Sequence, residues 1–325
     1  MSMPASVVIL AGGLSHERDV SLRSGRRVAE ALRHNGSDVD VLDVGADLLD
    51  SLAARRPAVV VPLLHGATGE DGSLRDVLEL LGLPYVGSRP QPSRTAFDKP
   101  SAKAAVAAAG VATTDGVSLP ASTFRELGAT SVMAALVERL GLPLMVKPTS
   151  GGSSLGASVV RTVAELPGAM VGCFAYGATA LVESYVAGTE VAVSVVETAE
   201  GVVALPAVEI VPDGGFYDYA ARYTAGTTEF FAPGRLDDEV AARCAAAAVA
   251  AHEALGLRDL SRTDLVVDAD GVPTFLEVNV APGMTETSLF PQAVAASGLD
   301  FGSVWQALVQ RAAARSATAA AGPAR

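Results

Sequence analysis

The sequence predicts an N-terminal α/β domain built on a parallel sheet, followed by a small central α+β domain and a C-terminal α+β domain. The chain has 325 residues, of which 50% are hydrophobic, so it can form two or three compact domains with substantial cores. Within the first 90 residues, short apolar runs alternate with segments of helical spacing, which is the pattern of a parallel sheet. A Pro- and Ser-rich stretch at residues 87–95 then predicts a loop at a domain boundary.

Apolar runs that end at turn residues define the N-terminal domain. Residues 6–13 end in Gly12-Gly13, which is typical of a buried strand that enters a tight turn. The other elements expected here are a helix at 20–34, strands at 38–44 and 58–64, and a helix at 74–81. Because parallel strands share one carboxyl edge, Gly12-Gly13 and His65-Gly66 are expected at a ligand-binding edge.

The two later domains follow from a less regular alternation of elements. The central domain is expected to contain helices at 99–109 and 132–140, strands at 143–148, 157–160 and 180–186, and a helix that starts near residue 163. The C-terminal domain is expected to contain strands from residue 189, an Ala-rich helix at 237–255, a hairpin at 260–278 and helices that end near residue 311. The predicted domains are therefore 1–90, 91–185 and 186–312. Residues 313–325 offer little to bury and are expected to form a disordered tail.

The overall composition argues against several classes of protein. A net charge of −12 disfavours sequence-independent binding to nucleic acid. Charges, glycines and prolines interrupt the apolar stretches, so no membrane span is expected, and the first residues lack the basic start of a signal peptide. Cys173 and Cys244 lack metal-ligand spacing, as in proteins of a reducing compartment. We therefore expect a cytoplasmic protein that has neither nucleic acid nor a membrane as its partner.

The segment 261–279 is predicted to be a hairpin that collects carboxylates. Asp270-Gly271 is a strong signal for a two-residue turn, and the pairing that follows places Asp264 opposite Glu277. The same pairing places Arg262 opposite Asn279. Since side chains alternate along a strand, all four project from one face. The residues expected on the other face are Leu265, Val267, Leu276 and Val278.

Two interpretations of this polar face are open. Carboxylates directly opposite one another repel, and a cation between them removes the penalty. Carboxylate and amide oxygens suit Mg²⁺, which takes further ligands from water and substrate phosphates. The alternative is a solvated polar face opposite a buried one. The pair Asp264 and Glu277, accompanied by an amide and an arginine, favours the metal site.

A loop of glycines and serines at 150–156 follows the strand that ends near Lys147. Such a loop can fold over phosphates because glycine allows close backbone approach and the serine hydroxyls add donors. It is not a P-loop, because the terminal Gly-Lys-Ser/Thr is missing and a strand follows. An ordinary flexible loop is the alternative. Lys147 favours the phosphate site, because a lysine at an apolar strand end needs a negative or acceptor partner.

Several segments, taken in order, resemble the D-alanine–D-alanine ligases of the ATP-grasp superfamily. The resemblance runs from about residue 6 to 311. Its segments are AGGLSHERDVSLRSG, LLHGATGEDGSLRDVLELLGLPYVGS, the pair Asp98-Lys99 with Lys103, PLMVKPTSGGSSLG, FYDYAARY, SRTDLVVD and TFLEVNVAPGMTETSL. Their shared order and spacing make the resemblance specific.

This resemblance implies an ATP-grasp fold of three domains and a role for each matching residue. The ATP contacts would be Lys99, Lys147, Ser153, Ser154, Glu183, Tyr185, Val186, Glu190, Arg222 and Phe275. The ligands of Mg²⁺ or Mn²⁺ would be Asp264, Glu277 and Asn279. Glu17, near His65, would bind the first D-alanine, and Ser153 and Tyr223 would join Glu17 in a hydrogen-bonded set. Arg262 and the Gly283 N–H would stabilise the tetrahedral oxyanion, and Ser288 and Leu289 would receive the carboxylate of the second D-alanine.

The activity implied is ligation of two D-alanines through an acyl phosphate, for peptidoglycan precursors, by a homodimer. Three positions depart from the common pattern: Arg222 replaces Lys, Ser261 replaces Gly, and Ala281 stands where Ser or Leu is usual. The alternatives are a ligase that uses D-serine or D-lactate as its second substrate, a nucleotide-binding pseudoenzyme, and a general carboxylate–amine ligase. Tyr223 favours an amine as the second substrate, because D-lactate-using relatives generally lack it.

Overall fold

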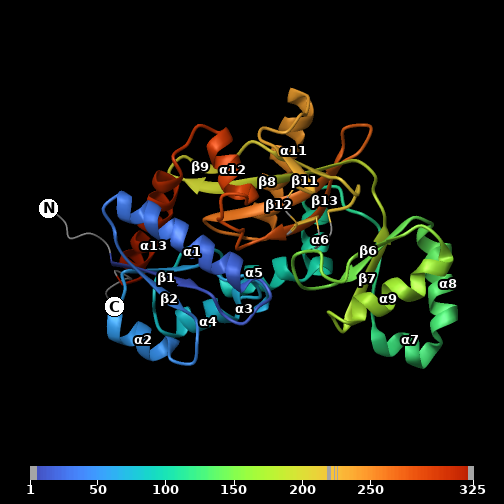
Figure 1. Cartoon of the computed structure of the whole chain (residues 1–325), viewed down its shortest axis with the longest axis horizontal. Coiled ribbons are helices and arrows are strands. Elements are labelled where there is room, and N and C mark those ends of the chain that lie inside the picture. The colour runs from blue at the N-terminus through green and yellow to red at the C-terminus, as the bar shows by residue number, and fades with distance from the viewer. Residues whose placement is uncertain (1–5, 218–220, 223, 225, 321–325) are drawn as a thin grey trace.

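Three sheets organise the computed structural model, which describes residues 6–217, 221, 222, 224 and 226–320 (Figure 1). The first sheet is parallel, in the order β2-β1-β3, as predicted for the N-terminal segment. Its strands are β1 (Ser6–Ala11), β2 (Asp38–Asp43) and β3 (Val59–Pro62). The helices that accompany it are α1 (Arg18–His34), α2 (Leu48–Arg55), α3 (Ala67–Glu70) and α4 (Ser73–Leu80).

Alternation along β1 buries both faces of this sheet. Val7 and Ile9 pack in one apolar cluster with α1 and the C-terminal helix α13 (Phe301–Ala320), whereas Val8 and Leu10 pack in another with α2 and α4. Successive side chains point to opposite faces, so an all-apolar strand is covered on both sides.

The second sheet is antiparallel, in the order β4-β7-β5-β6. Its strands are β4 (Gly116–Pro120), β5 (Leu144–Pro148), β6 (Ser158–Val160) and β7 (Thr179–Ser184). It packs with α7 (Ala121–Leu127), α8 (Ala129–Leu140) and α9 (Leu166–Phe174), the last preceded by a 3₁₀ turn, η1 (Val163–Glu165). The sequence did not predict β4, which is a half-exposed edge strand with little apolar character.

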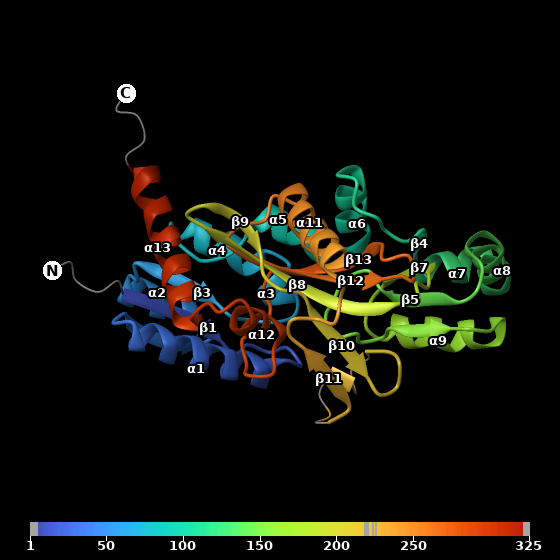
Figure 2. The ribbon, with the colours of Figure 1, turned by 90° about the horizontal axis from the view of Figure 1, so that it is seen from above.

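The third sheet lies between the other two, which occupy opposite ends of the molecule (Figure 2). Its order is β11-β10-β8-β12-β13, and β9 also pairs with β8. Its strands are β8 (Thr189–Thr198), β9 (Gly201–Ala204), β10 (Val208–Pro212), β11 (Thr228–Phe231), β12 (Leu260–Val267) and β13 (Pro273–Asn279). The neighbouring helices are α5 (Pro90–Phe97), α6 (Lys99–Ala108), α11 (Asp238–Ala254) and α12 (Leu289–Ala296).

Two sequence expectations about irregular segments are wrong. The stretch 87–95 contains the start of helix α5, because a proline at the first helical position has a suitable φ and loses no required hydrogen bond. Helix α13 continues to Ala320, so the predicted disorder is wrong for residues 313–320, and residues 321–325 lie outside the described part of the chain. Arg315 anchors this helix, since its guanidinium donates to both oxygens of the fully buried Asp259 at 2.7 Å.

The division into domains at 90/91 and 185/186 stays a prediction. Ala96 of α5, and Ala102 and Val106 of α6, share an apolar cluster with β8, β13 and α11. This packing favours a central unit that begins after these two helices. Cys173 and Cys244 are buried and are free thiols. No helix within the described residues has both the length and the apolar character needed to cross a bilayer.

Candidate active site

The carboxyl edge of the first sheet carries a tight glycine turn that leads into α1. Gly12 and Gly13 have φ angles of 83° and 76°. A Cβ on Gly12 would lie 2.1 Å from Oδ1 of Asp43, so a larger residue would displace that carboxylate and would also strain the left-handed backbone. The Gly12 N–H donates to Oγ of Ser21 at 2.8 Å, which ties the turn to the helix. This turn places Glu17 directly before the first residue of α1.

Glu17 connects this edge to the Gly/Ser loop that follows β5. The Ser153 hydroxyl donates to Oε1 of Glu17 at 2.5 Å, although 136 residues separate them in sequence. Ser153 and Ser154 have φ angles of 54° and 55°, a left-handed conformation that costs a non-glycine residue about 1–2 kcal/mol. Contacts such as the bond to Glu17 offset this cost. The predicted phosphate loop and the predicted amino-acid site therefore adjoin one another.

The segment after β3, which includes α3, carries two buried titratable side chains. His65 donates from Nδ1 to the Ala281 carbonyl at 3.0 Å, and its Nε2 has no hydrogen-bond partner among the described residues. Burial lowers the pKa of His65, against the opposing effect of the Glu17 carboxylate. Glu70 accepts a hydrogen bond from the Gly66 N–H at 2.8 Å, and burial raises its pKa to about 8. The imidazole and the Glu70 carboxyl are therefore both predominantly neutral at pH 7.

Strands β12 and β13 of the hairpin pair as predicted at the end away from their turn. Arg262 pairs with Asn279, and Asp264 pairs with Glu277. Arg262 donates to both carboxylate oxygens of Asp264, from Nε at 2.7 Å and from Nη2 at 2.8 Å. Burial alone would lower the pKa of Arg262, but the Asp264 carboxylate raises it above its ordinary value. Arg262 and Asp264 thus form a buried ion pair of fixed geometry.

The turn of the hairpin differs from the prediction. The connection spans residues 268–272 rather than the two residues Asp270-Gly271. Oδ1 of Asp268 accepts hydrogen bonds from the N–H groups of Asp270 at 3.0 Å and Val272 at 2.8 Å. These hydrogen bonds from backbone N–H groups to the Asp268 side chain stabilise a wider loop.

A β-bulge after Asp264 changes which side chain of β13 enters the site. Leu265 pairs with Phe275 rather than with Leu276, so β13 contains one extra residue. Phe275 is fully buried in the apolar cluster that includes Val278, whereas Leu276 lines a cavity on the opposite side. The prediction that Phe275 contacts ATP is therefore wrong, as is the placement of Leu276 on the apolar face.

All three lysines of the chain lie at this site. Nζ of Lys147 is 2.5 Å from Oε1 of Glu183, and Nζ of Lys103 is 2.6 Å from Oε2 of the same carboxylate. Nζ of Lys99 is 3.1 Å from Oε2 of Glu277. Each lysine is less than a tenth exposed, so each needs such a partner. The site therefore concentrates buried positive charge around two carboxylates.

The carboxylates at the site differ in their protonation. Burial alone would raise the pKa of Glu183, but its two lysines lower it to about 2. The same balance holds for Glu277, where Lys99 helps to lower the pKa to about 2. Burial raises the pKa of Glu190 to about 7, although Arg222 acts in the opposite direction. Because this pKa lies near neutrality, a further cation nearby would favour the charged form of Glu190.

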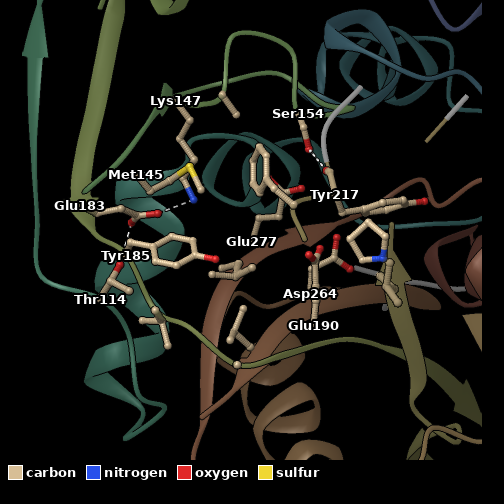
Figure 3. Close-up of a pocket in the computed structure, with 18 of the residues that line it drawn as sticks. Thr114, Met145, Lys147, Ser154, Glu183, Tyr185, Glu190, Tyr217, Asp264 and Glu277 are labelled. Atoms are coloured by element: carbon tan, nitrogen blue, oxygen red, sulfur yellow. Dashed lines mark hydrogen bonds and ion pairs between the residues drawn. The ribbon is translucent and has the colours of Figure 1, made fainter. Parts of the chain in front are cut away.

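Two adjoining cavities receive these side chains. The first, of about 350 Å³, lies between β5, β7, β10 and the hairpin (Figure 3). The predicted ATP contacts that line it are Lys99, Lys147, Ser154, Glu183, Tyr185, Val186, Glu190 and Arg222. Figure 3 shows the carboxyl groups of Glu190 and Asp264 side by side on the floor of this cavity.

The second cavity, of about 540 Å³, lies between the edge of the first sheet and the hairpin. The predicted substrate and catalytic residues that line it are Glu17, His65, Ser153, Arg262, Gly283, Ser288 and Leu289. Glu277 lines both cavities, and Asn279 lines the second. Tyr223 lies outside the described residues.

Sequence reasoning missed several residues of the site. The Thr114 hydroxyl donates to Glu183 at 2.7 Å and accepts from Lys103 at 2.5 Å, but Thr114 belongs to a loop with no sequence signal. The guanidinium of Arg222 lies 4.3 Å from the ring centroid of Tyr217, which is buried beside both cavities. Tyr217 and Glu70 both fall within segments of the resemblance, FYDYAARY and LLHGATGEDG, which was the available signal.

The chain is similar in sequence and in fold to known proteins. A family model described as the D-ala D-ala ligase C-terminus matches residues 106–310. A D-alanine–D-alanine ligase of Anaeromyxobacter dehalogenans (strain 2CP-C) is 43% identical over 295 residues, which cover 91% of this chain and 92% of that protein. The Bacillus anthracis D-alanine–D-alanine ligase complexed with ATP superposes with a TM-score of 0.80 at 27% identity, covering 97% of this chain and 99% of that one. The VanG D-Ala:D-Ser ligase of Enterococcus faecalis gives a TM-score of 0.82 at 27% identity, covering 95% and 99%.

Proposed function

The chain belongs to the D-alanine–D-alanine ligase family, and we propose that it joins two D-alanine molecules at the expense of ATP, releasing ADP and phosphate, in the synthesis of peptidoglycan precursors. One contact within the candidate site supports this proposal most directly. The hydrogen bond from Ser153 to Glu17 brings the Gly/Ser loop against the edge where the first D-alanine would bind. A nucleotide phosphate and an amino-acid carboxylate can therefore meet between them.

The nucleotide would occupy the first cavity. Lys147 and Lys99 line this cavity, and they would neutralise charge on the phosphates. Glu183, Tyr185 and Val186, at the end of β7 and just beyond it, would contact the adenine, and Glu190 the ribose. The serines of the Gly/Ser loop would donate to the phosphates. Oxygen of the first D-alanine carboxylate would then attack the γ-phosphorus, releasing ADP and forming an acyl phosphate.

The second cavity would hold the two amino acids. Glu17 would bind the ammonium group of the first D-alanine. The amine nitrogen of the second D-alanine, after losing its proton, would attack the acyl carbonyl carbon, and phosphate would leave as the amide forms. Arg262 and the Gly283 N–H would donate to the oxyanion of that step, a contribution worth about 3 kcal/mol per donor in comparable sites. The contact between Ser153 and Glu17 would help to exclude water, which otherwise hydrolyses the acyl phosphate.

The donor set fits a magnesium or manganese ion. Asp264 and Glu277 are directly opposed, and Asn279 lies two residues beyond Glu277 on the same strand. No group of three or more His, Cys, Asp or Glu side chains arranged to hold a metal is found in the described ranges. Two carboxylates and an amide match an ion that completes its shell with phosphate and water. When bound, the ion would neutralise charge on the transferring phosphoryl group; Arg262 and Lys99 now pair with the same carboxylates.

Phosphate release tests the proposed function. ATP with D-alanine should yield phosphate and D-alanyl-D-alanine, whereas L-alanine or no amino acid should not. Phosphate release that is independent of D-alanine would refute the assignment. ATP binding without turnover would favour the pseudoenzyme.

The identity of the acceptor is a second question. The likeness to a D-Ala:D-Ser ligase keeps D-serine as an alternative. Competition among D-alanine, D-serine and D-lactate decides it, and predominant ester formation would contradict an amine acceptor. We further propose that the protein is cytoplasmic and that it forms a homodimer. Light scattering would measure the oligomeric state.

A further inference from the structure

A cation that has no partner in the described part of the chain lines the cavity assigned to the two amino acids. Arg23 lies in the middle of α1, with its side chain exposed on the wall of the second cavity. Within the described residues, Arg23 makes no hydrogen bond or ion pair. Other cations of this cavity have partners, such as Glu277 for Lys99 and Asp264 for Arg262. Arg23 therefore has its full charge available to a ligand.

Helix α1 packs against the turn that carries the predicted acceptor site. A side-chain methyl of Val20 lies 3.8 Å from where a Cβ on Gly283 would be. Ser24 accepts a hydrogen bond from the Met284 N–H at 3.0 Å. Val20 lies three residues before Arg23, so these two side chains share one side of the helix, and Ser24 directly follows Arg23 in the sequence.

A further anchor lies one turn along the helix. Arg27, four residues after Arg23, donates to the Thr285 carbonyl at 2.7 Å. Contacts before and after Arg23 therefore fix the backbone from which its side chain extends. The guanidinium can reach into the cavity beside Ser288 and Leu289, which line the same space.

The acidic side chains of the cavity already have their own donors. Glu17 accepts from Ser153 at 2.5 Å, and Glu70 accepts from a backbone N–H at 2.8 Å. Glu277 lies beside Lys99 at 3.1 Å. None of the three pairs with Arg23.

The chemistry of the reaction supplies a natural partner for this charge. The carboxylate of the first amino acid is consumed when it forms the acyl phosphate, but the carboxylate of the second stays ionised from binding to product release. The groups assigned to it, at Ser288 and Leu289, are an uncharged hydroxyl and backbone N–H groups. A guanidinium offers a carboxylate two parallel hydrogen bonds together with a compensating charge.

We propose that Arg23 binds the α-carboxylate of the acceptor amino acid and thereby sets the affinity of the second substrate site. This inference rests on the proposed ligase function. It makes Arg23 a substrate-binding residue of the acceptor site, while the first D-alanine and ATP depend on other groups.

Initial rates of phosphate release against D-alanine concentration, fitted with separate KM values for the two D-alanine sites, test the proposal. Arg23→Gln should raise the second KM about tenfold, a size typical of a hydrogen-bonded charge pair that is partly solvated, and should leave the first KM and the KM for ATP within about twofold. Arg23→Lys should fall between Arg23→Gln and wild type. Raising the salt concentration should narrow the difference in the second KM between wild type and Arg23→Gln, because screening weakens exposed charge pairs.

Arg26→Gln is the matched control, because Arg26 is an exposed arginine of the same helix that does not line the cavity. Identical second KM values for the Arg23→Gln and Arg26→Gln proteins would overturn the proposal. An equal rise in all three KM values, accompanied by a lower melting temperature, would overturn it as well, since that pattern indicates a structural role. The wild-type protein is assayed first: absence of D-alanine-dependent phosphate release there refutes the ligase function itself, whereas activity without an Arg23 effect refutes the acceptor role alone.

Discussion

Replacement of Lys103 by methionine is expected to destabilise the fold and weaken ATP binding, because it removes one of two cations from a buried carboxylate. Glu183 is 1% exposed, with Lys103 at 2.6 Å and Lys147 at 2.5 Å. Methionine is of similar length and fills most of the same space, so the loss is one of charge and hydrogen bonding. The neighbouring Thr114 hydroxyl also loses the donor that lies 2.5 Å away.

The magnitude follows from the environment of Glu183. Burial opposes ionisation, yet the lysines lower the Glu183 pKa from 4.5 to about 2, which corresponds to about 3 kcal/mol of preference for the charged carboxylate. Removing one partner of a buried pair commonly costs about 3–5 kcal/mol. Because Lys147 remains, we expect the free energy of unfolding at pH 7 to fall by about 2 kcal/mol. The KM for ATP should rise as Lys147 and Glu183 reorient.

The pH dependence has a defined sign. The pKa of Glu183 is lower in the folded state than in the unfolded state, so its stabilisation is complete above about pH 4.5 and is lost as the pH falls towards 2. Urea unfolding of wild type and Lys103→Met should therefore differ most near neutral pH. The difference in the free energy of unfolding between the two proteins should narrow in acid.

Two variants control this experiment. In a Glu183→Gln background, Lys103→Met should be neutral or stabilising, because it removes a buried cation that has lost its partner. Arg243→Met breaks an exposed i,i+4 pair with Glu239, at 2.7 Å, and should cost less than about 1 kcal/mol. A Lys103→Met loss below about 0.5 kcal/mol, or an equal loss in both Glu183 backgrounds, would refute the reasoning.

Three further predictions follow from the same contacts. Ser153→Ala removes the 2.5 Å bond to Glu17 and should lower kcat/KM for D-alanine about 10- to 100-fold in the phosphate-release assay, whereas an unchanged value would separate the Gly/Ser loop from the amino-acid site. A lysine-directed acylating reagent should inactivate the enzyme, and ATP should slow the modification of Lys99 and Lys147, which line the first cavity, as followed by peptide mass spectrometry; equal rates with and without ATP would contradict their shared location. Arg315→Met should lower the free energy of unfolding by about 2 kcal/mol or more, because it leaves the fully buried Asp259 without its bidentate partner, and urea unfolding indistinguishable from wild type would disprove this anchoring of α13.

Much of the site followed from local pattern. The alternation of a strand is a property of its own backbone, so the facing pairs of Asp264 with Glu277 and Arg262 with Asn279 were predictable from the sequence. The glycines after β1 likewise marked a turn whose positive φ angles favour glycine. Family resemblance then supplied roles that no spacing rule gives, such as that of Glu17.

Other parts of the site depended on contacts between distant segments. The bulge that sends Leu276 into the cavity and Phe275 into the core adds one residue at little local cost, and packing on both sides of the sheet decides where it falls. Residues 90–95 form the start of helix α5 because prolines are tolerated in a first turn and Pro90 and Ser93 are buried.

The sequence by itself determined the two kinds of sheet, the carboxylate face of the hairpin and the Gly/Ser loop, because each depends on residues that are neighbours in the chain or on a period of two. The contact between Ser153 and Glu17 was implied by the resemblance, and the structure contains it. Only the tertiary structure decided that Lys103 shares a carboxylate with Lys147, and that Arg23 lines the second cavity with no partner among the described residues. The physical reason is that these contacts join residues from different sheets or helices, whose relative positions are set by the burial of apolar surface over the whole chain rather than by any local preference.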